Sequence, residues 1–251
     1  MKKIFIIIVL SLLPVALSAN TVYPDASRGD EHYRLGNYDS AIACYQATLQ
    51  AGLTSAELHY NLGNAYYRDG QLANAILHYR RALRLNPSMA DAKQNLALAS
   101  SHTVDRIPVL PRFFLVSWVD TLSTDVTPAA WRAVWLAIFA LLAIAVVVFL
   151  RGNSRGLRKT GLVVTIVMAL FLVIATWLLL RTTTRYNAHA DAVVMPQAVT
   201  VKGSPETESV DKLTLHEGTV VTITDSLSGW YKITLADGTT GWCATNHLER
   251  I

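Results

Sequence analysis

The sequence contains little of what metal, redox or nucleophilic chemistry requires. Only two of its 251 residues are cysteines, Cys44 and Cys243. They fall in different predicted folded units, so we expect two separate buried thiols, with a bridge between them as the alternative. The sequence has no CxxC, HExxH or nucleophile-elbow pattern, and its seven histidines are scattered. It therefore predicts no catalytic site, no metal site and no cofactor.

Charge is absent from two long apolar runs in the middle of the chain, residues 133–150 and 160–180. As helices these runs would be about 27 and about 31 Å long, close to the roughly 30 Å of hydrocarbon in a bilayer. We therefore expect transmembrane helices at residues 131–150 and 160–180. The alternative is a helix pair buried in a soluble core.

Acidic residues are absent from the intervening loop, residues 151–159. The loop is basic, and its charged residues are Arg151, Arg155, Arg158 and Lys159. Loops of this kind stay in the cytoplasm. We therefore expect the regions before and after the hairpin to be periplasmic. Three tryptophans would then lie at the periplasmic interface of the membrane that the helices span: Trp131, Trp135 and Trp177.

The N-terminus resembles a secretory signal peptide. Lys2 and Lys3 precede an apolar stretch over residues 4–15, and small residues, Ser18 and Ala19, follow it. We expect residues 1–19 to be a signal peptide cleaved near Ala19, with an uncleaved signal anchor as the alternative.

The formal net charge of +4 does not indicate nucleic-acid binding. Residues 20–100 contain seven acidic and seven basic residues, and residues 186–251 contain eight acidic and four basic residues. The basic excess therefore comes from the signal peptide and the membrane flanks, where it orients helices and contacts lipid headgroups. We expect the lipid bilayer as a partner and exclude nucleic acid.

Residues 56–87 carry a set of small, apolar and aromatic residues at fixed spacing: Leu62, Gly63, Tyr66, Gly70, Ala75, Tyr79, Ala82 and Pro87. These residues occupy the signature positions of the tetratricopeptide repeat, a helix pair of 34 residues, which this segment resembles. A weaker copy lies 34 residues earlier, and residues 90–101, with Leu96 inward, form a capping helix. We expect an all-α repeat domain over residues 20–101, in which Gly63 and Ala75 allow two helices to approach closely.

The resemblance implies that the groove lined by the first helices of the repeats binds peptides. The groove-facing positions are Glu57, Tyr60, Asn64, Tyr67, Arg68 and Gln94. By the same resemblance, Asn64 would hold a peptide backbone. The alternative is that these are solvated consensus residues and that the repeats contact a partner through another face.

Residues 102–130 form a juxtamembrane segment with one apolar, aromatic face. Phe114, Trp118 and Leu122 recur at the spacing of one face of a helix. This pattern suits a helix that lies in the headgroup region. Thr127 and Pro128 are predicted as the N-cap and first residue of the first transmembrane helix.

The last part of the chain, residues 188–251, consists of short alternating runs separated by turn signals such as Asp237-Gly238. The order and spacing of these runs resemble the bacterial SH3 family, a small all-β barrel. Alternation directs Tyr231, Ile233 and Cys243 into the barrel, and Trp230 and Trp242 away from it. The two tryptophans are predicted to form a partner-binding platform. The alternative is that the loop over residues 202–214 covers them.

The sequence thus predicts a multidomain membrane protein with an all-α tetratricopeptide repeat domain, two transmembrane helices and a small all-β SH3-like barrel. This order resembles the BatE proteins of the Bacteroides aerotolerance operon. The resemblance implies a membrane protein that acts with other products of that operon in stress tolerance. We therefore expect a non-enzymatic scaffold that holds periplasmic partners at the inner membrane. The alternative hypothesis is a module that binds peptidoglycan peptides. A third hypothesis is an enzyme or redox carrier.

Overall fold

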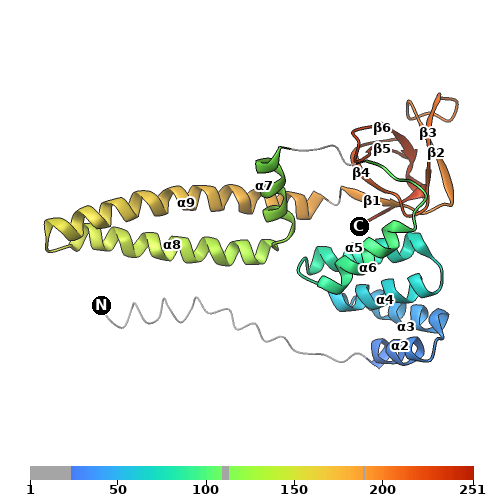
Figure 1. Ribbon diagram of the computed structural model, residues 1–251, viewed down its shortest axis with the longest axis horizontal. Helices are drawn as coiled ribbons and strands as arrows, with labels where there is room; N and C mark the ends of the chain where they lie inside the picture. Colours follow the sequence, from blue (N-terminus) through green and yellow to red (C-terminus); the bar gives the residue numbers. More distant parts are fainter. Residues whose placement is uncertain (1–23, 109–112, 189) are drawn as a thin grey trace.

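The computed structural model describes residues 24–108, 113–188 and 190–251. A stack of helices and a small β-barrel lie together at one end of a long helical hairpin (Figure 1). The predicted signal peptide, residues 1–19, lies outside the described residues, as does part of the predicted juxtamembrane segment.

The helical stack consists of two helix pairs and a capping helix, as the repeat pattern predicts. Its helices are α2 (Pro24–Arg34), α3 (Tyr38–Gln50), α4 (Ala56–Arg68), α5 (Leu72–Leu85) and α6 (Ala90–Ser101). The hydroxyl of Ser55 starts α4 by accepting a 3.0 Å hydrogen bond from the Leu58 N–H. Gly70, at φ +82°, turns the chain from α4 into α5, a conformation that favours glycine.

Two glycines allow the tyrosine rings of the repeats to pack closely. A Cβ added at Gly63 would lie 2.8 Å from Cδ1 of Tyr79, and Gly29 has the same relationship to Tyr45. Both tyrosines are fully buried, at 1% and 2% exposure. Leu96 of the capping helix packs against the same core, as predicted.

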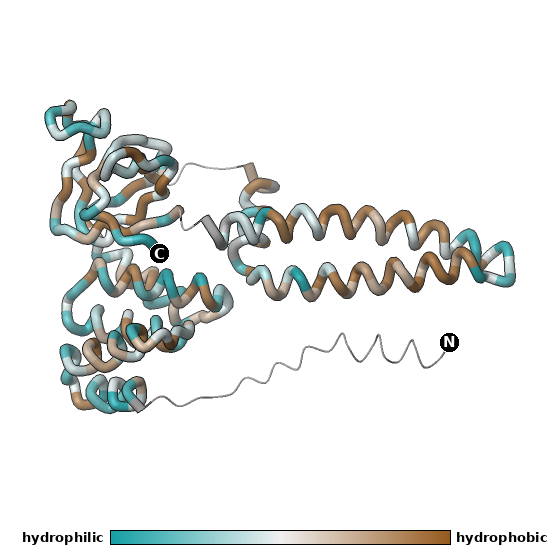
Figure 2. Tube along the Cα trace, turned by 180° about the vertical axis from the view of Figure 1, so that it is seen from behind, coloured by the Kyte–Doolittle hydropathy of each residue, from teal (hydrophilic) through white to brown (hydrophobic). Residues whose placement is uncertain are grey.

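The hairpin is formed by α8 (Pro128–Arg151) and α9 (Arg155–Ala188). Thr127 caps α8, with its hydroxyl 3.3 Å from the Ala130 N–H, and Pro128 follows as the first helical residue. Both helices contain stretches long and apolar enough to cross a membrane, and only 6% and 11% of the residues there are buried by the rest of the chain. Figure 2 shows the apolar residues continuing along both helices.

The turn of the hairpin is shorter than predicted. It comprises residues 152–154, because Ser154 begins α9 by accepting a 3.2 Å hydrogen bond from the Leu157 N–H. Arg155, Arg158 and Lys159 therefore lie in the first turns of α9, at the same end of the hairpin as the predicted loop. At its other end α9 extends past residue 180 to Ala188.

The C-terminal part is a seven-stranded antiparallel sheet in the order β3-β2-β6-β5-β4-β1-β7. Its strands are β1 (Asp191–Val194), β2 (Ala198–Lys202), β3 (Asp211–His216), β4 (Val220–Leu227), β5 (Trp230–Thr234), β6 (Thr240–Ala244) and β7 (Leu248–Arg250). Ile233 and Cys243 are buried in the barrel core, and Tyr231 packs against it, as alternation predicts. Both cysteines are free, Cys243 fully buried and Cys44 partly so.

The barrel packs directly on the helical stack, which the sequence did not predict. Val193 of β1 belongs to the core of the stack, and Val220 and Ile251 pack against that core. Gly218 lies so close to α5 that an added Cβ would come 2.8 Å from Cδ1 of Ile76. Arg84 donates a 2.7 Å hydrogen bond to the backbone oxygen of Ile251. The two domains therefore share an apolar interface.

Candidate functional site

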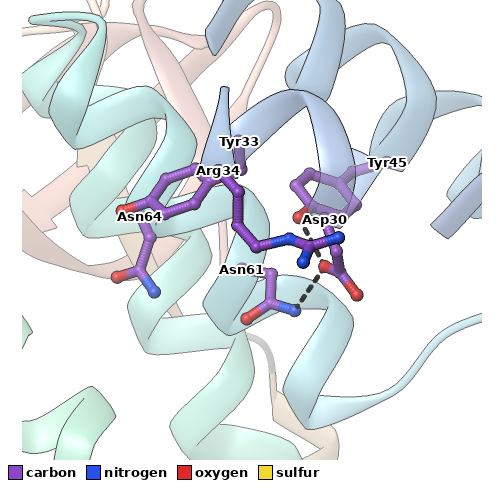
Figure 3. Close-up of a pocket in the computed structure, with 6 residues that line it drawn as sticks. All are labelled: Asp30, Tyr33, Arg34, Tyr45, Asn61 and Asn64. Carbon is purple, nitrogen blue, oxygen red and sulfur yellow. Dashed lines mark hydrogen bonds between the residues drawn. The ribbon is translucent and has the colours of Figure 1, made fainter. Parts of the chain in front are cut away.

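A pocket of about 140 Å³ lies where α2 and α4, the first helices of the two repeats, stand side by side. Its lining residues are Asp30, Tyr33, Arg34, Tyr45, Asn61 and Asn64. Figure 3 shows the side chains of Arg34 and Asn61 extending toward Asp30. The pocket therefore has a carboxylate, a guanidinium and two amides between aromatic rings.

Asp30 is the hydrogen-bond acceptor of the pocket. Its Oδ1 atom accepts a 2.6 Å hydrogen bond from the Tyr45 hydroxyl and a 3.2 Å bond from the Asn61 amide. Burial, followed by the contact with Asp30, raises the pKa of Tyr45. The Tyr45 hydroxyl therefore stays protonated and holds the Asp30 carboxylate in place.

Asn64 has its side-chain oxygen already engaged. Oδ1 accepts 2.8 Å hydrogen bonds from the Tyr79 hydroxyl and from the Asn95 amide of α6. Burial raises the pKa of Tyr79, which keeps that hydroxyl a donor. A ligand would therefore meet the NH₂ group of Asn64, which can donate to a peptide carbonyl.

The other predicted groove residues do not line this pocket. Tyr60 is half-buried with its ring 6.1 Å from that of Tyr79, and Arg68 lies over the ring of Tyr38 at 5.3 Å. The Tyr67 hydroxyl lies 3.5 Å from Nδ1 of His102. Glu57 and Gln94 are exposed. The structure thus brings only Asn64 of the predicted set into the pocket, and partner binding by the others stays a prediction.

The pocket residues of the first repeat were not predicted as groove residues, although the repeat period contains the signal. Asp30, Tyr33, Arg34 and Tyr45 each lie 34 residues before a residue already singled out in the second repeat. Their counterparts are Asn64, Tyr67, Arg68 and Tyr79. Shifting the groove prediction back by one period would have found Asp30, Tyr33 and Arg34, and shifting the packing position Tyr79 would have found Tyr45.

A second candidate surface lies on the outer face of the barrel. Trp242 stands opposite Lys202 of β2 on one side and opposite Lys232 of β5 on the other. Trp230 is two residues from Lys232 and therefore shares its face. Both tryptophans are partly exposed. The face combines aromatic rings with two cationic side chains.

The loop between β2 and β3 is held by contacts among its own residues. The hydroxyl of Ser204 donates to that of Ser209 at 2.8 Å, and Lys202 pairs with Asp211 at 2.5 Å. Val210, the apolar residue at its end, is 78% exposed to solvent. Val210 therefore gives the loop no apolar anchor on the two tryptophans.

The described residues contain no group of three or more His, Cys, Asp or Glu side chains placed to hold a metal ion. They do contain a buried histidine pair in the repeat core, with Nδ1 of His59 3.0 Å from Nδ1 of His78. Burial, assisted by the nearby Arg81, lowers the pKa of His59 to about 4. Burial and the contacts with His59 and Arg81 lower the pKa of His78 to about 3. Both rings are therefore neutral near pH 7.

Comparison with known families supports the two folded parts. Residues 27–90 match the tetratricopeptide repeat family, and residues 199–249 match the bacterial SH3 domain family. No curated protein matches the chain. The predicted fold class is confirmed: a helical repeat domain, two apolar helices and an SH3-like β-domain. Both matched families are typically interaction modules without catalytic activity, which supports a role in binding proteins.

Proposed function

We propose that this protein is a non-enzymatic scaffold of the bacterial inner membrane that holds protein partners on the periplasmic side. The pocket between α2 and α4 carries the proposal, because it presents donors and an acceptor on the face through which repeats of this kind bind peptides. The two matched interaction families support it.

The proposed ligand of the pocket is an extended segment of a partner protein. Arg34, Asn61 and the NH₂ group of Asn64 would donate to its backbone or side-chain oxygens, and Asp30 would accept from an N–H group. Tyr60, Tyr67 and Arg68 lie on the same helix as Asn61 and Asn64 and would extend the contact along α4.

The proposed topology places the hairpin in the membrane and both folded domains outside the cytoplasm. The basic residues at the turn of the hairpin support this orientation, since positive charge is retained in the cytoplasm. The helical stack and the barrel both lie at the opposite end of the hairpin (Figure 1). A signal peptide over residues 1–19 would export the first domain.

The proposed biological setting is a stress-related membrane complex. It rests on the order of repeat domain, hairpin and SH3-like barrel, which resembles the BatE proteins of the Bacteroides aerotolerance operon. Under this proposal, the partners are other membrane or periplasmic products of the same operon.

The test is purification of the full chain in a mild detergent, followed by identification of the proteins that co-elute. Arg34→Ala should weaken the recovered complex by roughly ten- to a hundredfold, since loss of a charged hydrogen-bond partner costs about 1.5 to 3 kcal/mol. Arg28→Ala is the matched control, because Arg28 lies on the same helix but outside the pocket. Equal recovery with both variants would refute the pocket as the binding site.

Binding of peptidoglycan peptides is the second candidate function. The position of Trp242 beside Lys232 favours it, because an aromatic ring next to a cation suits a peptide that carries carboxylates. The full chain would be incubated with cell-wall sacculi, and Lys232→Glu compared with Lys212→Glu on β3. If only Lys232→Glu abolishes retention of the chain on the sacculi, the result supports this function. Equal retention of the Lys232→Glu and Lys212→Glu variants would count against it.

A further inference from the structure

The short helix α7 (Phe114–Thr124) has a polar side that is tied to the rest of the chain. Asp120 pairs with Arg181 of α9 at 2.6 Å. Asp125, directly after α7, pairs with Lys93 of α6 at 3.1 Å. Ser123 is buried, at 4% exposure. The acidic groups at α7 are thus neutralised by cations on both the hairpin and the helical stack.

The other side of α7 is aromatic and lacks cover. Phe113, Phe114 and Trp118 are 63%, 67% and 63% exposed. The rings of Phe113 and Phe114 lie 4.7 Å apart and form one apolar cluster. Phe114 and Trp118 are four residues apart and therefore share a helix face, which is turned away from Asp120. An exposed cluster of this kind marks an interaction surface.

The position of α7 indicates what covers this cluster. α7 runs across the axis of the hairpin at the end of its apolar stretch (Figure 1), and brown apolar residues continue from the hairpin to this point (Figure 2). Trp131 of α8 donates a 3.2 Å hydrogen bond from Nε1 to the Leu122 oxygen. Trp177 of α9 lies beside Arg181, whose guanidinium is 5.6 Å from the ring centre. Tryptophans and arginines gather at the headgroup level of membranes.

We propose that α7 is a membrane-surface helix whose aromatic cluster, Phe113, Phe114 and Trp118, inserts into the outer leaflet of the same bilayer that the hairpin spans. The exposed cluster continues the apolar surface of α8 and α9, so one lipid surface covers both. The ion pairs on the polar side of α7 connect this anchor to α6 and α9. Insertion of α7 thereby fixes the height and tilt of the repeat domain above the membrane. This inference rests on the hairpin spanning the bilayer and not on the identity of any partner.

The test measures the depth of single nitroxide labels on the full chain, reconstituted in vesicles of zwitterionic and anionic phospholipid. The labels replace Phe114 or Trp118 in a Cys44→Ser background, and Cys243 is kept because its side chain is 0% exposed. A label at Leu35 of the repeat domain is the aqueous control, and one at Val173 of α9 is the hydrocarbon control, at 68% and 67% exposure. A high rate of collision between the label and oxygen indicates a lipid environment, and a high rate with a water-soluble nickel chelate indicates water. The ratio of the two collision rates therefore gives the depth of the label.

The labels at positions 114 and 118 should give oxygen-to-nickel ratios between those of the two controls, which corresponds to a depth of about 5 to 10 Å into the headgroup and acyl boundary. Ratios equal to that of Leu35 would overturn the proposal. Exclusion of both reagents would also overturn it, because protein and not lipid would then cover the cluster. A water-like ratio at Val173 would refute the membrane span itself.

Discussion

The carboxylate of Asp105 holds His216 across the interface between the helical stack and the barrel, 111 residues apart in sequence. Oδ2 accepts a 2.7 Å hydrogen bond from the His216 backbone N–H, and Oδ1 lies 2.7 Å from Nδ1 of the same residue. The Thr219 hydroxyl donates to Oδ2 at 2.6 Å. The segment after α6 therefore fastens the turn between β3 and β4 to the stack.

Asp105→Ala is predicted to loosen this interface. The change leaves donors of His216 and Thr219 without their acceptor, which costs about 1 to 3 kcal/mol of stability. Burial alone would raise the pKa of Asp105, but the hydrogen bonds from Thr219 and His216 outweigh it and lower the pKa below its ordinary value. The ionised Asp105 carboxylate therefore contributes its full stabilisation of the folded state at neutral pH, and this stabilisation is lost as the pH falls below about 4.

Thermal unfolding of the full chain in detergent, followed between pH 7 and pH 3, measures the effect of Asp105→Ala. The loss of stability relative to the unchanged protein should be largest near neutral pH and shrink in acid. Asp237→Ala, in the turn after β5, is the control. A deficit of the same size at every pH would contradict the ionised carboxylate as its source.

The buried histidine pair predicts a second acid effect, located in the repeat domain. The unfolded chain binds protons at His59 and His78 below about pH 6.5, whereas the folded chain resists protonation until about pH 4 and pH 3. Acidification from pH 7 to pH 5 should therefore cost roughly 2 kcal/mol of stability per histidine. His78→Phe should flatten the pH dependence of the melting temperature, and His102→Gln, at an exposed position, should not. An unchanged slope in His78→Phe would mean that the pair does not titrate in this way.

Gly63→Leu is predicted to destabilise the repeat domain by about 1 to 3 kcal/mol, because the new side chain would collide with the Tyr79 ring. Ala97→Leu is the matched control, since Ala97 lies one repeat period later at an exposed position of α6. Denaturant unfolding of both variants, each as the full chain, provides the comparison. Similar midpoints for the two would show that the close contact at Gly63 tolerates a large side chain.

Labelling of introduced cysteines tests the orientation of the hairpin. Cysteines at Asn153 or Ser154, in the turn, should be protected from an impermeant thiol reagent in intact cells. A cysteine at Thr184, at the opposite end of α9, should react once the outer membrane is permeabilised. The buried Cys243 should stay unlabelled, and Cys44→Ser removes the other thiol. The reverse labelling pattern would invert the proposed topology.

Trp230 and Trp242 are predicted to serve binding more than folding. Both are partly exposed and lie outside the barrel core, so substitution by alanine should cost only about 1 to 2 kcal/mol. Ile233→Ala, at a position with 1% exposure, should cost about 2 to 5 kcal/mol. The full chain is used because β1 packs on the helical stack. Loss of partner recovery without unfolding would identify binding residues, whereas unfolding on either change would assign that tryptophan to the core.

Sequence by itself determined the elements whose signals are local. The repeat spacing placed Gly63 against a helix crossing, the uncharged runs predicted α8 and α9, and alternation directed Ile233 and Cys243 into the barrel. Each of these depends on residues close in sequence and on the period of a helix or strand. The shorter turn of the hairpin escaped prediction because basic side chains continue a helix once Ser154 caps it.

Tertiary structure alone decided how the parts meet. The contacts of Asp105 with His216, of Gly218 with Ile76 and of Arg84 with Ile251 join segments more than a hundred residues apart. Such pairs leave no periodic signal, because each is a single contact whose geometry depends on two already folded surfaces. The pocket beside Asn64 is different, because the repeat period does mark its positions in the first repeat. Tertiary structure still forms it, since only the packing of α2 against α4 brings Asp30 within reach of Asn61.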